Sequence, residues 1–264
     1  MTNRTAAPRL KGLSKPDAGE IHLWHLASSS AVEPGFYTVG ENFLSAEERN
    51  RLAGMKHPRP AARFLRGRIL ARRVLGGYLS EDPRAVELVV DGVGKPSVGS
   101  TSESSLAFSL SHADEETILA VAADGDIGVD VEALTKASAA MRIAREFYTD
   151  PELRSLDHIG GDKLEAALKL WTLKESIVKA RGQTVWDGLK GVDLTIEGDE
   201  FRWHVSPPER DRWCLAAGRF GPTYCLAVAW RMPDVGRAIS VTFKRFGVDG
   251  ALLPGEVFEP DFVN

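Results

Sequence analysis

Apolar and polar residues alternate along several short segments of the chain, a pattern that predicts half-buried β-strands. The segments with this pattern are residues 21–27, 86–91, 106–113, 117–123 and 126–132, followed later by residues 191–197, 200–206, 212–220 and 223–231. A tight glycine turn at residues 123–126 joins the last two segments of the first group. Strands that follow one another so closely favour antiparallel sheets.

The first helical unit lies after the first strand-like segment. Residues 43–53 have helical spacing, and Ser45 is the predicted N-cap because its hydroxyl can accept a backbone N–H bond of the first turn. Residues 62–79 form a longer predicted helix. We expect Gly76 and Gly77 to close it, because glycine is common where a helix ends.

The second helical unit repeats this order later in the chain. Residues 147–156 predict a short helix, and residues 164–182 predict a long one that ends at Gly182. The two units lie about 100 residues apart and strands follow each of them, which indicates an internal duplication. We therefore predict an α+β fold of two similar halves related by a pseudo-twofold axis, with antiparallel sheets, packed helices and the active site in the cleft between the halves.

This pattern divides the chain into four expected parts. Residues 1–20 are polar and contain proline and glycine, so they are expected to form a loose leader. Residues 21–129 make up the predicted N-terminal half, and residues 130–231 make up the C-terminal half. Residues 232–264 follow as a tail, for which the pattern predicts no role.

Composition and charge are those of an ordinary globular protein. The 264 residues are 43% apolar and 27% charged, as in globular proteins generally. A net charge of −4 offers no basic field that would draw the molecule to nucleic acid or to an anionic membrane. No apolar run approaches the roughly 20 residues of a membrane span, and the N-terminus lacks the apolar core of a secretory signal. We expect a cytoplasmic protein, with Cys214 and Cys225 as reduced core thiols.

Two acidic residues at the end of a predicted strand are candidates for chemistry. Asp130 and Glu132 are two residues apart, so a strand sends both side chains to one face. Trp171, Glu175 and Lys179 follow at intervals of four residues and share one helix face. If strand and helix meet, three carboxylates and an ammonium group gather, which suits Mg²⁺ and a phosphate. The alternative is a solvated acidic pair and a helix-stabilising ion pair.

Basic residues are concentrated around the start of the first long helix. The cluster has no acidic residue among its members, which are Lys56, Arg59, Arg63, Arg66, Arg68, Arg72 and Arg73. Arg63, Arg66 and Arg73 are spaced so that they can share one helix face, which favours binding of an anion. A solvated basic helix face is the alternative interpretation.

Further polar residues lie between this cluster and the acidic pair. Lys95 is in a Gly-Lys-Pro turn, a stiff loop of a common kind. Ser109 and Ser111 share one strand face, and His112 lies opposite them or at the strand end. A single histidine is more often a hydrogen-bonded structural residue than a catalytic one. The order in which all these residues occur together is therefore more informative than any one of them.

Three segments in this order resemble a known family. They read GKPSV (residues 94–98), FSLSHADEETILAVAADGDIGVDVE (residues 108–132) and WTLKESIVKARG (residues 171–182). They resemble the signature blocks of the 4′-phosphopantetheinyl transferases, specifically the monomeric, duplicated, surfactin-synthetase-activating (Sfp) type. The resemblance implies that the phosphopantetheine arm of coenzyme A is transferred to a serine of an acyl or peptidyl carrier protein, with release of 3′,5′-ADP. It also implies Mg²⁺, or Mn²⁺ in its place, a monomer, and no nucleic-acid or membrane partner.

The resemblance also implies roles for individual residues. Asp130, Glu132 and Glu175 resemble the metal ligands, and Asp130, Glu175 and Lys179 stand at the catalytic positions. Lys179 resembles the lysine beside the pyrophosphate of coenzyme A. Glu175 or a water on the metal is the candidate base for the carrier serine. The other residues that resemble coenzyme A contacts are Lys95, Ser111 and His112 at the phosphates and Arg63 at the nucleotide end, with Lys56 or Arg59 beside it.

Some positions depart from the family pattern. Ser109 stands where many relatives have asparagine, Ala113 where they have a small hydroxyl residue, and Phe64 where some have a small hydroxyl residue that faces the coenzyme. None of the three carries the metal, so activity is expected to survive. Apolar residues within 147–153 and 164–170 are expected to receive the carrier protein.

Two other functions fit the same residues. One is a module that binds coenzyme A or a carrier protein without catalysis. The other is a Mg²⁺-dependent phosphohydrolase that uses the same acids with water as the acceptor. A mass shift of a carrier incubated with coenzyme A would favour the transferase, and cleavage of coenzyme A without any carrier would favour the hydrolase.

Overall fold

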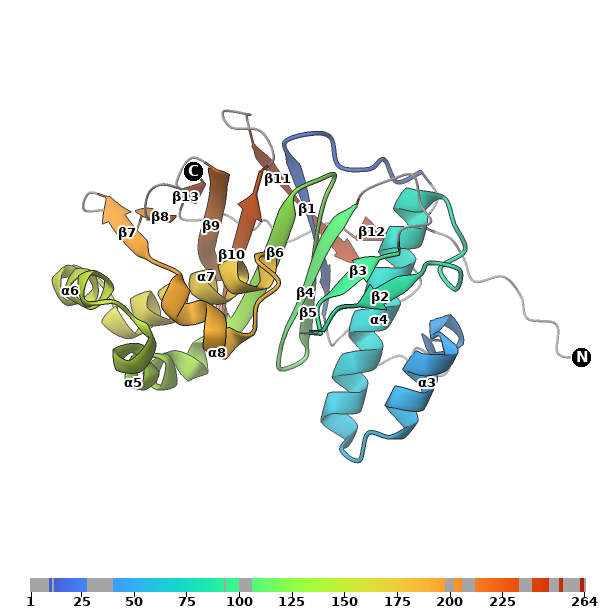
Figure 1. Ribbon diagram of the computed structural model, residues 1–264, viewed down its shortest axis with the longest axis horizontal. Coiled ribbons are helices and arrows are strands. Elements are labelled where there is room, and N and C mark those ends of the chain that lie inside the picture. Colours follow the sequence, from blue (N-terminus) through green and yellow to red (C-terminus); the bar gives the residue numbers. More distant parts are fainter. Residues whose placement is uncertain are drawn as a thin grey trace, which may run out of the picture.

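Two main sheets stand next to each other in the computed structural model, and one long helix covers the outer face of each (Figure 1). The structure describes residues 10, 12–27, 40–92, 94–99, 106–197, 202–205, 212–232, 239–246, 252–253 and 262–263. This arrangement confirms the predicted α+β class. The internal duplication stays a prediction.

The first sheet has the strand order β12-β11-β1-β5-β4. Its strands are β1 (Glu20–Leu26), β4 (Ala107–Ala113), β5 (Glu116–Ala122), β11 (Ser240–Phe246) and β12 (Leu252–Leu253). All neighbours pair antiparallel except β1 and β11, which run parallel. The prediction of antiparallel sheets is wrong at this pair, because β11 comes from the tail and reaches β1 through a long connection and not through a hairpin.

Two helices belong to this half, α3 (Ala46–Ala53) and α4 (Pro58–Leu79). The predicted N-cap of α3 is confirmed. Ser45 Oγ accepts the backbone N–H of Glu48 at 3.1 Å, and Glu48 Oε2 accepts the backbone N–H of Ser45 at 2.8 Å. This reciprocal pair satisfies two N–H groups that a helix start otherwise leaves unpaired.

The predicted end of α4 at Gly76 and Gly77 is wrong, because the helix continues to Leu79. Close packing explains both glycines. A Cβ on Gly77 would lie 2.7 Å from Leu13 Cδ1, and a Cβ on Gly76 would lie 3.1 Å from the carbonyl oxygen of Glu81. A larger residue at either position would therefore force its neighbours to shift slightly, so both glycines fit close packing along α4 and do not mark its end.

The second sheet has the order β13-β9-β10-β6 and is antiparallel throughout. Its strands are β6 (Asp126–Ala133), β9 (Trp213–Phe220), β10 (Tyr224–Arg231) and β13 (Phe262–Val263). Strand β6 pairs with β10 along its whole length. The expected boundary between residues 129 and 130 thus falls inside a strand of the second sheet, and the glycine turn at 123–126 joins two sheets and not two paired strands.

The helices of this half are α5 (Ala137–Phe147), α6 (Asp150–His158), α7 (Lys163–Ala180) and α8 (Val185–Gly188). Helices α6 and α7 were predicted, and Gly182 follows α7 with a φ of +63°. Helix α5 was not predicted, although its buried residues Ala140, Ala144 and Phe147 have helical spacing. Three short 3₁₀ helices are η1 (Glu41–Phe43), η2 (Leu134–Lys136) and η3 (Leu189–Gly191). Two small two-stranded sheets are formed by β2 (Leu88–Val90) with β3 (Pro96–Val98), and by β7 (Leu194–Glu197) with β8 (Arg202–Val205).

Three apolar clusters fill the spaces between these layers. One lies between α4 and the first sheet, and a second lies between α7 and the second sheet. The third lies between the two sheets and contains Leu23 of β1, Val129 and Val131 of β6, and Val228 of β10. Since neighbours in a strand point to opposite faces, Asp130 and Glu132 must face α7 and not this third cluster.

Both ends of the described chain take part in packing. Leu10, within the expected leader, is buried in the first apolar cluster. In the tail, Phe246 is completely buried in that same cluster, while the ring of Phe243 lies 5.5 Å from that of Phe220 in β9. Strand β11 thus contacts both halves. Within the described residues no helix is long and apolar enough to cross a membrane. Cys214 and Cys225 are both buried, and neither forms a disulfide bond with another described residue.

Candidate active site between the two sheets

Helix α7 approaches β6 very closely at Gly128. A Cβ at this position would lie 1.9 Å from the carbonyl oxygen of Ser176, so only glycine allows the helix to lie this near the strand. Gly128, Asp130 and Glu132 alternate on the same face. The close approach therefore brings the polar stripe of α7, with Glu175 and Lys179, against the acidic pair of β6.

An ion pair joins the strand and the helix. Lys179 Nζ lies 2.6 Å from Asp130 Oδ1 and also donates to Ser111 Oγ at 3.0 Å and to the Val129 carbonyl oxygen at 3.2 Å. Burial acts to lower the pKa of Lys179, but Asp130 and Glu175 outweigh it and raise that pKa above the ordinary value. Lys179 is thus held as a cation at neutral pH.

Asp130 is buried and only half satisfied. Its Oδ1 accepts hydrogen bonds from Lys179 and from Ser111 Oγ, the latter at 2.9 Å. Its Oδ2 is buried and has no hydrogen-bond partner within the part of the chain that the structure describes. A buried carboxylate oxygen without a partner is costly, so this atom marks a place where a positive group would be stabilised.

The other two acids, Glu132 and Glu175, both have raised pKa values. Burial, with the neighbouring Asp130, raises the pKa of Glu175 to about 8, although a hydrogen bond from Trp171 opposes the shift. Burial and Asp130 also raise the pKa of Glu132, whose Oε2 accepts a hydrogen bond from Lys136 Nζ at 2.5 Å. Three carboxylates therefore influence one another in a poorly solvated space.

The predicted metal centre is only partly assembled. Among the described residues, no three His, Cys, Asp or Glu side chains are gathered so that they could hold a metal ion. Lys179 lies against Asp130, and Lys136 lies against Glu132, so ammonium groups hold two of the carboxylates. The unpaired Asp130 Oδ2 and the raised pKa of Glu175 nevertheless fit a divalent cation, because both indicate negative charge in excess of its compensation.

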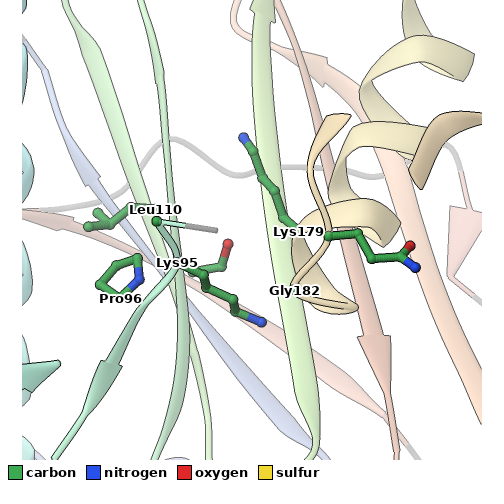
Figure 2. Close-up of a pocket in the computed structure, with 8 residues that line it drawn as sticks. Lys95, Pro96, Leu110, Lys179 and Gly182 are labelled. Atoms are coloured by element: carbon green, nitrogen blue, oxygen red, sulfur yellow. The ribbon is translucent and has the colours of Figure 1, made fainter. Parts of the chain in front are cut away.

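A cavity of about 200 Å³ opens beside Lys179. Figure 2 shows Lys95 and Pro96 on one side of it and Lys179 and Gly182 on the other. Lys95 Nζ donates to the Ala180 carbonyl oxygen at 2.9 Å, and burial lowers the pKa of Lys95. The glycine-lysine-proline turn therefore contacts the end of α7 and places a second amino group at this cavity.

A second cavity, of about 150 Å³, adjoins the first and shares Gly94, Pro96 and Leu110 with it. His112 lines this cavity and packs on α4, where a Cβ on Gly67 would lie 2.8 Å from the imidazole. Burial, followed by the positive charges of Lys179 and nearby arginines, lowers the pKa of His112 to about 3. The ring is therefore neutral.

The structure changes the interpretation of the arginine cluster. Arg66 is buried and pairs with Glu115, and Glu48 binds both Arg68, at 3.3 Å, and Arg72, at 2.9 Å. These three guanidinium groups have carboxylate partners. Arg66 and Arg73 are buried while Arg63 is exposed, so the predicted common anion-binding face of these three arginines is wrong. Glu48 and Glu115 lie far from the arginines in sequence, so local spacing could not reveal these pairs.

The exposed members of the cluster are Arg63, Lys56 and Arg59. They remain on the surface near the start of α4, and no contact of theirs with either cavity is found among the described residues. The cavity beside His112 is lined instead by Arg51, Phe64 and Arg68.

Arg68 is the binding candidate that sequence reasoning missed. Its Nη1 is buried and has no hydrogen-bond partner among the described residues, although its Nε faces Glu48. The Phe64 ring lies 5.1 Å from the guanidinium carbon of Arg51 and 5.3 Å from that of Arg68. The only sequence signal was membership of the basic cluster, which did not separate Arg68 from Arg66 and Arg72.

Comparison with known proteins gives a consistent result. The family described as the 4′-phosphopantetheinyl transferase superfamily matches residues 126–229, which include β6 and α7. The transferase HetI of a Nostoc species is 32% identical over 168 residues, which cover 63% of this chain and 70% of HetI.

Other relatives extend this similarity. The 4′-phosphopantetheinyl transferase ffp of Bacillus subtilis is 27% identical over 76% of this chain and 88% of its own length. The L-aminoadipate-semialdehyde dehydrogenase-phosphopantetheinyl transferase of Xenopus laevis is 28% identical over 71% of this chain and 66% of its own length. These matches favour the transferase over a non-catalytic module or a phosphohydrolase. The chain therefore belongs to the 4′-phosphopantetheinyl transferase superfamily.

Proposed function

We propose that the site between β6 and α7 is where this transferase moves the phosphopantetheine arm of coenzyme A onto a carrier-protein serine. Coenzyme A is the substrate of the family and a carrier protein is the acceptor. The contact of Lys179 with Asp130 carries the assignment, because it joins a cation and a half-satisfied carboxylate at the junction of the two sheets. Such a pair can bind a diphosphate only together with a further positive group.

Asp130, Glu132 and Glu175 would hold Mg²⁺, or Mn²⁺ in its place. The fit rests on the unpaired Asp130 Oδ2 and on the raised pKa values of Glu132 and Glu175. Asp130 would offer its unpaired Oδ2 while Oδ1 stays with Lys179 and Ser111, and Glu132 would exchange its contact with Lys136 for the ion. When bound, the ion would neutralise the carboxylates and hold oxygen atoms of the diphosphate.

Lys179 and Glu175 take complementary parts in the transfer. The serine oxygen of the carrier forms a bond to the β-phosphorus of coenzyme A, and the bond from that phosphorus to the bridging oxygen breaks, so 3′,5′-ADP leaves. Lys179 is held as a cation, and its positive charge stabilises the negative charge that develops on the departing phosphate. Glu175 accepts the serine proton in this scheme in its ionised form, which a neighbouring cation would favour, and a water held by the metal is the alternative base.

Coenzyme A would occupy the two adjoining cavities. Lys95 and Lys179 provide amino groups at the first cavity. The second is lined by the neutral His112 and by Arg68, whose Nη1 has no hydrogen-bond partner among the described residues, and the two side chains are suited to a phosphate of the nucleotide end. Arg63 would contact the coenzyme from the solvent side of the second cavity, because this exposed residue lies one helical turn before Gly67, which lines that cavity.

The carrier protein would dock on aromatic residues beside Glu175. Trp186 in α8 is 71% exposed, and its ring lies 5.5 Å from that of Phe147. Phe147 packs edge-on against Trp171, whose side chain hydrogen-bonds Glu175. A line of aromatic contacts thus runs from the proposed base through the buried Phe147 to the exposed Trp186, where the acceptor protein has to arrive.

The assignment is tested with Asp130→Ala and a purified apo carrier protein. Mass spectrometry should record a single phosphopantetheine addition with the wild-type protein, and a rate at least about 100-fold lower with the variant. Asp157→Ala is the control, because Asp157 is an exposed aspartate that pairs with Lys163 at the surface. Equal transfer by Asp130→Ala and the control, with both folded, would remove the assignment.

A further inference from the structure

Strands β4 and β6 lie side by side but belong to different sheets. Two serine hydroxyls bridge them. Ser109 Oγ accepts the backbone N–H of Val129 at 3.1 Å, and Ser111 Oγ accepts that of Val131 at 3.2 Å. Ser109 and Ser111 share one face of β4. Their hydroxyl groups accept N–H bonds of β6 that backbone carbonyl groups of β4 would accept if the two strands were paired in one sheet.

Ser111 makes two further contacts that Ser109 does not make. Its hydroxyl donates to Asp130 Oδ1 at 2.9 Å and accepts from Lys179 Nζ at 3.0 Å. A serine hydroxyl has one proton to donate and two lone pairs to accept with. The proton goes to Asp130, and the lone pairs receive Val131 and Lys179. The residue is 3% exposed, and its hydroxyl has no hydrogen-bonding capacity left for a ligand.

We infer that Ser111 is a positioning residue for the transfer, which acts through Asp130 and Lys179 and makes no side-chain contact with coenzyme A. This inference rests on the proposed function. By holding Oδ1, Ser111 and Lys179 fix the rotation of the Asp130 carboxylate, so the unpaired Oδ2 keeps one direction. Partners that orient a ligand in this way commonly change metal affinity 10- to 100-fold when removed.

The two serines allow a matched experiment. Ser109→Ala removes the bridge between strands, at a position that also lines the first cavity, and leaves the contacts of Asp130 in place. Ser111→Ala removes the same kind of bridge and also the hold on Asp130 and Lys179. Ser111→Thr keeps a hydroxyl and should restore the contacts. Ser111→Cys keeps the volume with a much weaker donor, so it replaces Ser111→Ala if that variant does not fold.

Three quantities are measured for each variant: the Kd for Mn²⁺, the Kd for coenzyme A in the presence of EDTA, and the melting temperature. We expect Ser111→Ala to weaken Mn²⁺ binding about 10- to 100-fold and to leave coenzyme A binding in EDTA within about twofold. Ser109→Ala should lower the melting temperature about as much as Ser111→Ala does, but it should leave the Kd for Mn²⁺ near the wild-type value. Ser111→Thr should return the Mn²⁺ affinity toward that of the wild-type protein.

Three results would overturn the inference. Weaker binding of coenzyme A in EDTA by Ser111→Ala would make Ser111 a direct coenzyme contact. Equal loss of Mn²⁺ affinity in Ser109→Ala and Ser111→Ala would reduce its role to the bridge between strands, and unchanged Mn²⁺ affinity in Ser111→Ala would leave it no positioning role. Transfer to a carrier by the wild-type protein separates these outcomes from failure of the proposed function, which would show as no transfer at all.

Discussion

Lys174 and Glu152 form an ion pair in which both side chains are completely buried, with Lys174 Nζ 2.8 Å from Glu152 Oε2. Lys174 also donates to the Val192 carbonyl oxygen at 2.7 Å, and Glu152 accepts the backbone N–H groups of Thr149 and Leu194. The pair therefore joins α6, α7 and the start of β7. Lys174 precedes Glu175 in the chain, so the same helix turn that carries the proposed base also anchors the C-terminal half.

Lys174→Met is expected to destabilise the protein by about 3–5 kcal/mol, because it leaves the Glu152 charge buried without its partner. Chemical denaturation measures the loss. Lys163→Met is the control: Lys163 pairs with Asp157 at the surface, and its loss should not measurably change stability. Similar denaturation midpoints for the two variants would contradict the structural role of Lys174.

Gly128→Ala is expected to separate α7 from β6. The added Cβ would lie 1.9 Å from the Ser176 carbonyl oxygen, so the helix must move and Lys179 must shift away from Asp130. We expect a lower melting temperature and a loss of transfer of about 100-fold or more, since small misplacements of catalytic groups are costly. Gly161→Ala has open space around its Cβ and is the control. Normal transfer by Gly128→Ala would disprove the close approach.

His112 should make the protein sensitive to acid. Burial and nearby cations lower its pKa from an ordinary 6.5 to about 3, so between these values the unfolded chain binds a proton that the folded protein does not. The stability that His112 contributes is complete above about pH 6.5 and is lost as the pH falls toward 3. In His112→Asn, the melting temperature should decline less between pH 7 and pH 4 than in the wild-type protein. An identical decline in both would contradict a neutral, buried imidazole.

Trp186→Ala is expected to change the KM for the carrier protein and not the KM for coenzyme A. Removing a large exposed aromatic contact should raise KM for the carrier about tenfold, while KM for coenzyme A stays the same. Val89→Ala is the matched control, because Val89 is a 47% exposed apolar residue of the other half. The docking surface would have to lie elsewhere if initial rates with varied carrier gave the same KM for Trp186→Ala as for the wild-type protein.

Much of this protein could be predicted from local sequence patterns. The alternation of Asp130 and Glu132 around Val131, and the spacing of Trp171, Glu175 and Lys179, describe faces of one strand and one helix. Such faces follow from the geometry of a few neighbouring residues, which is why the acidic pair, the helix stripe and the α+β class were predictable. The order of the same segments was sufficient to indicate the family.

Tertiary structure alone decided which groups meet. Glu48 and Glu115 became partners of the arginines of α4, Ser111 was fully engaged by β6 and α7, and strand β11 of the tail paired with β1. Each of these contacts joins residues far apart in the chain. Packing of the whole molecule brings such residues together, above all where Gly128 lets α7 approach β6. Local propensity depends on residues close in sequence, so it cannot predict these contacts.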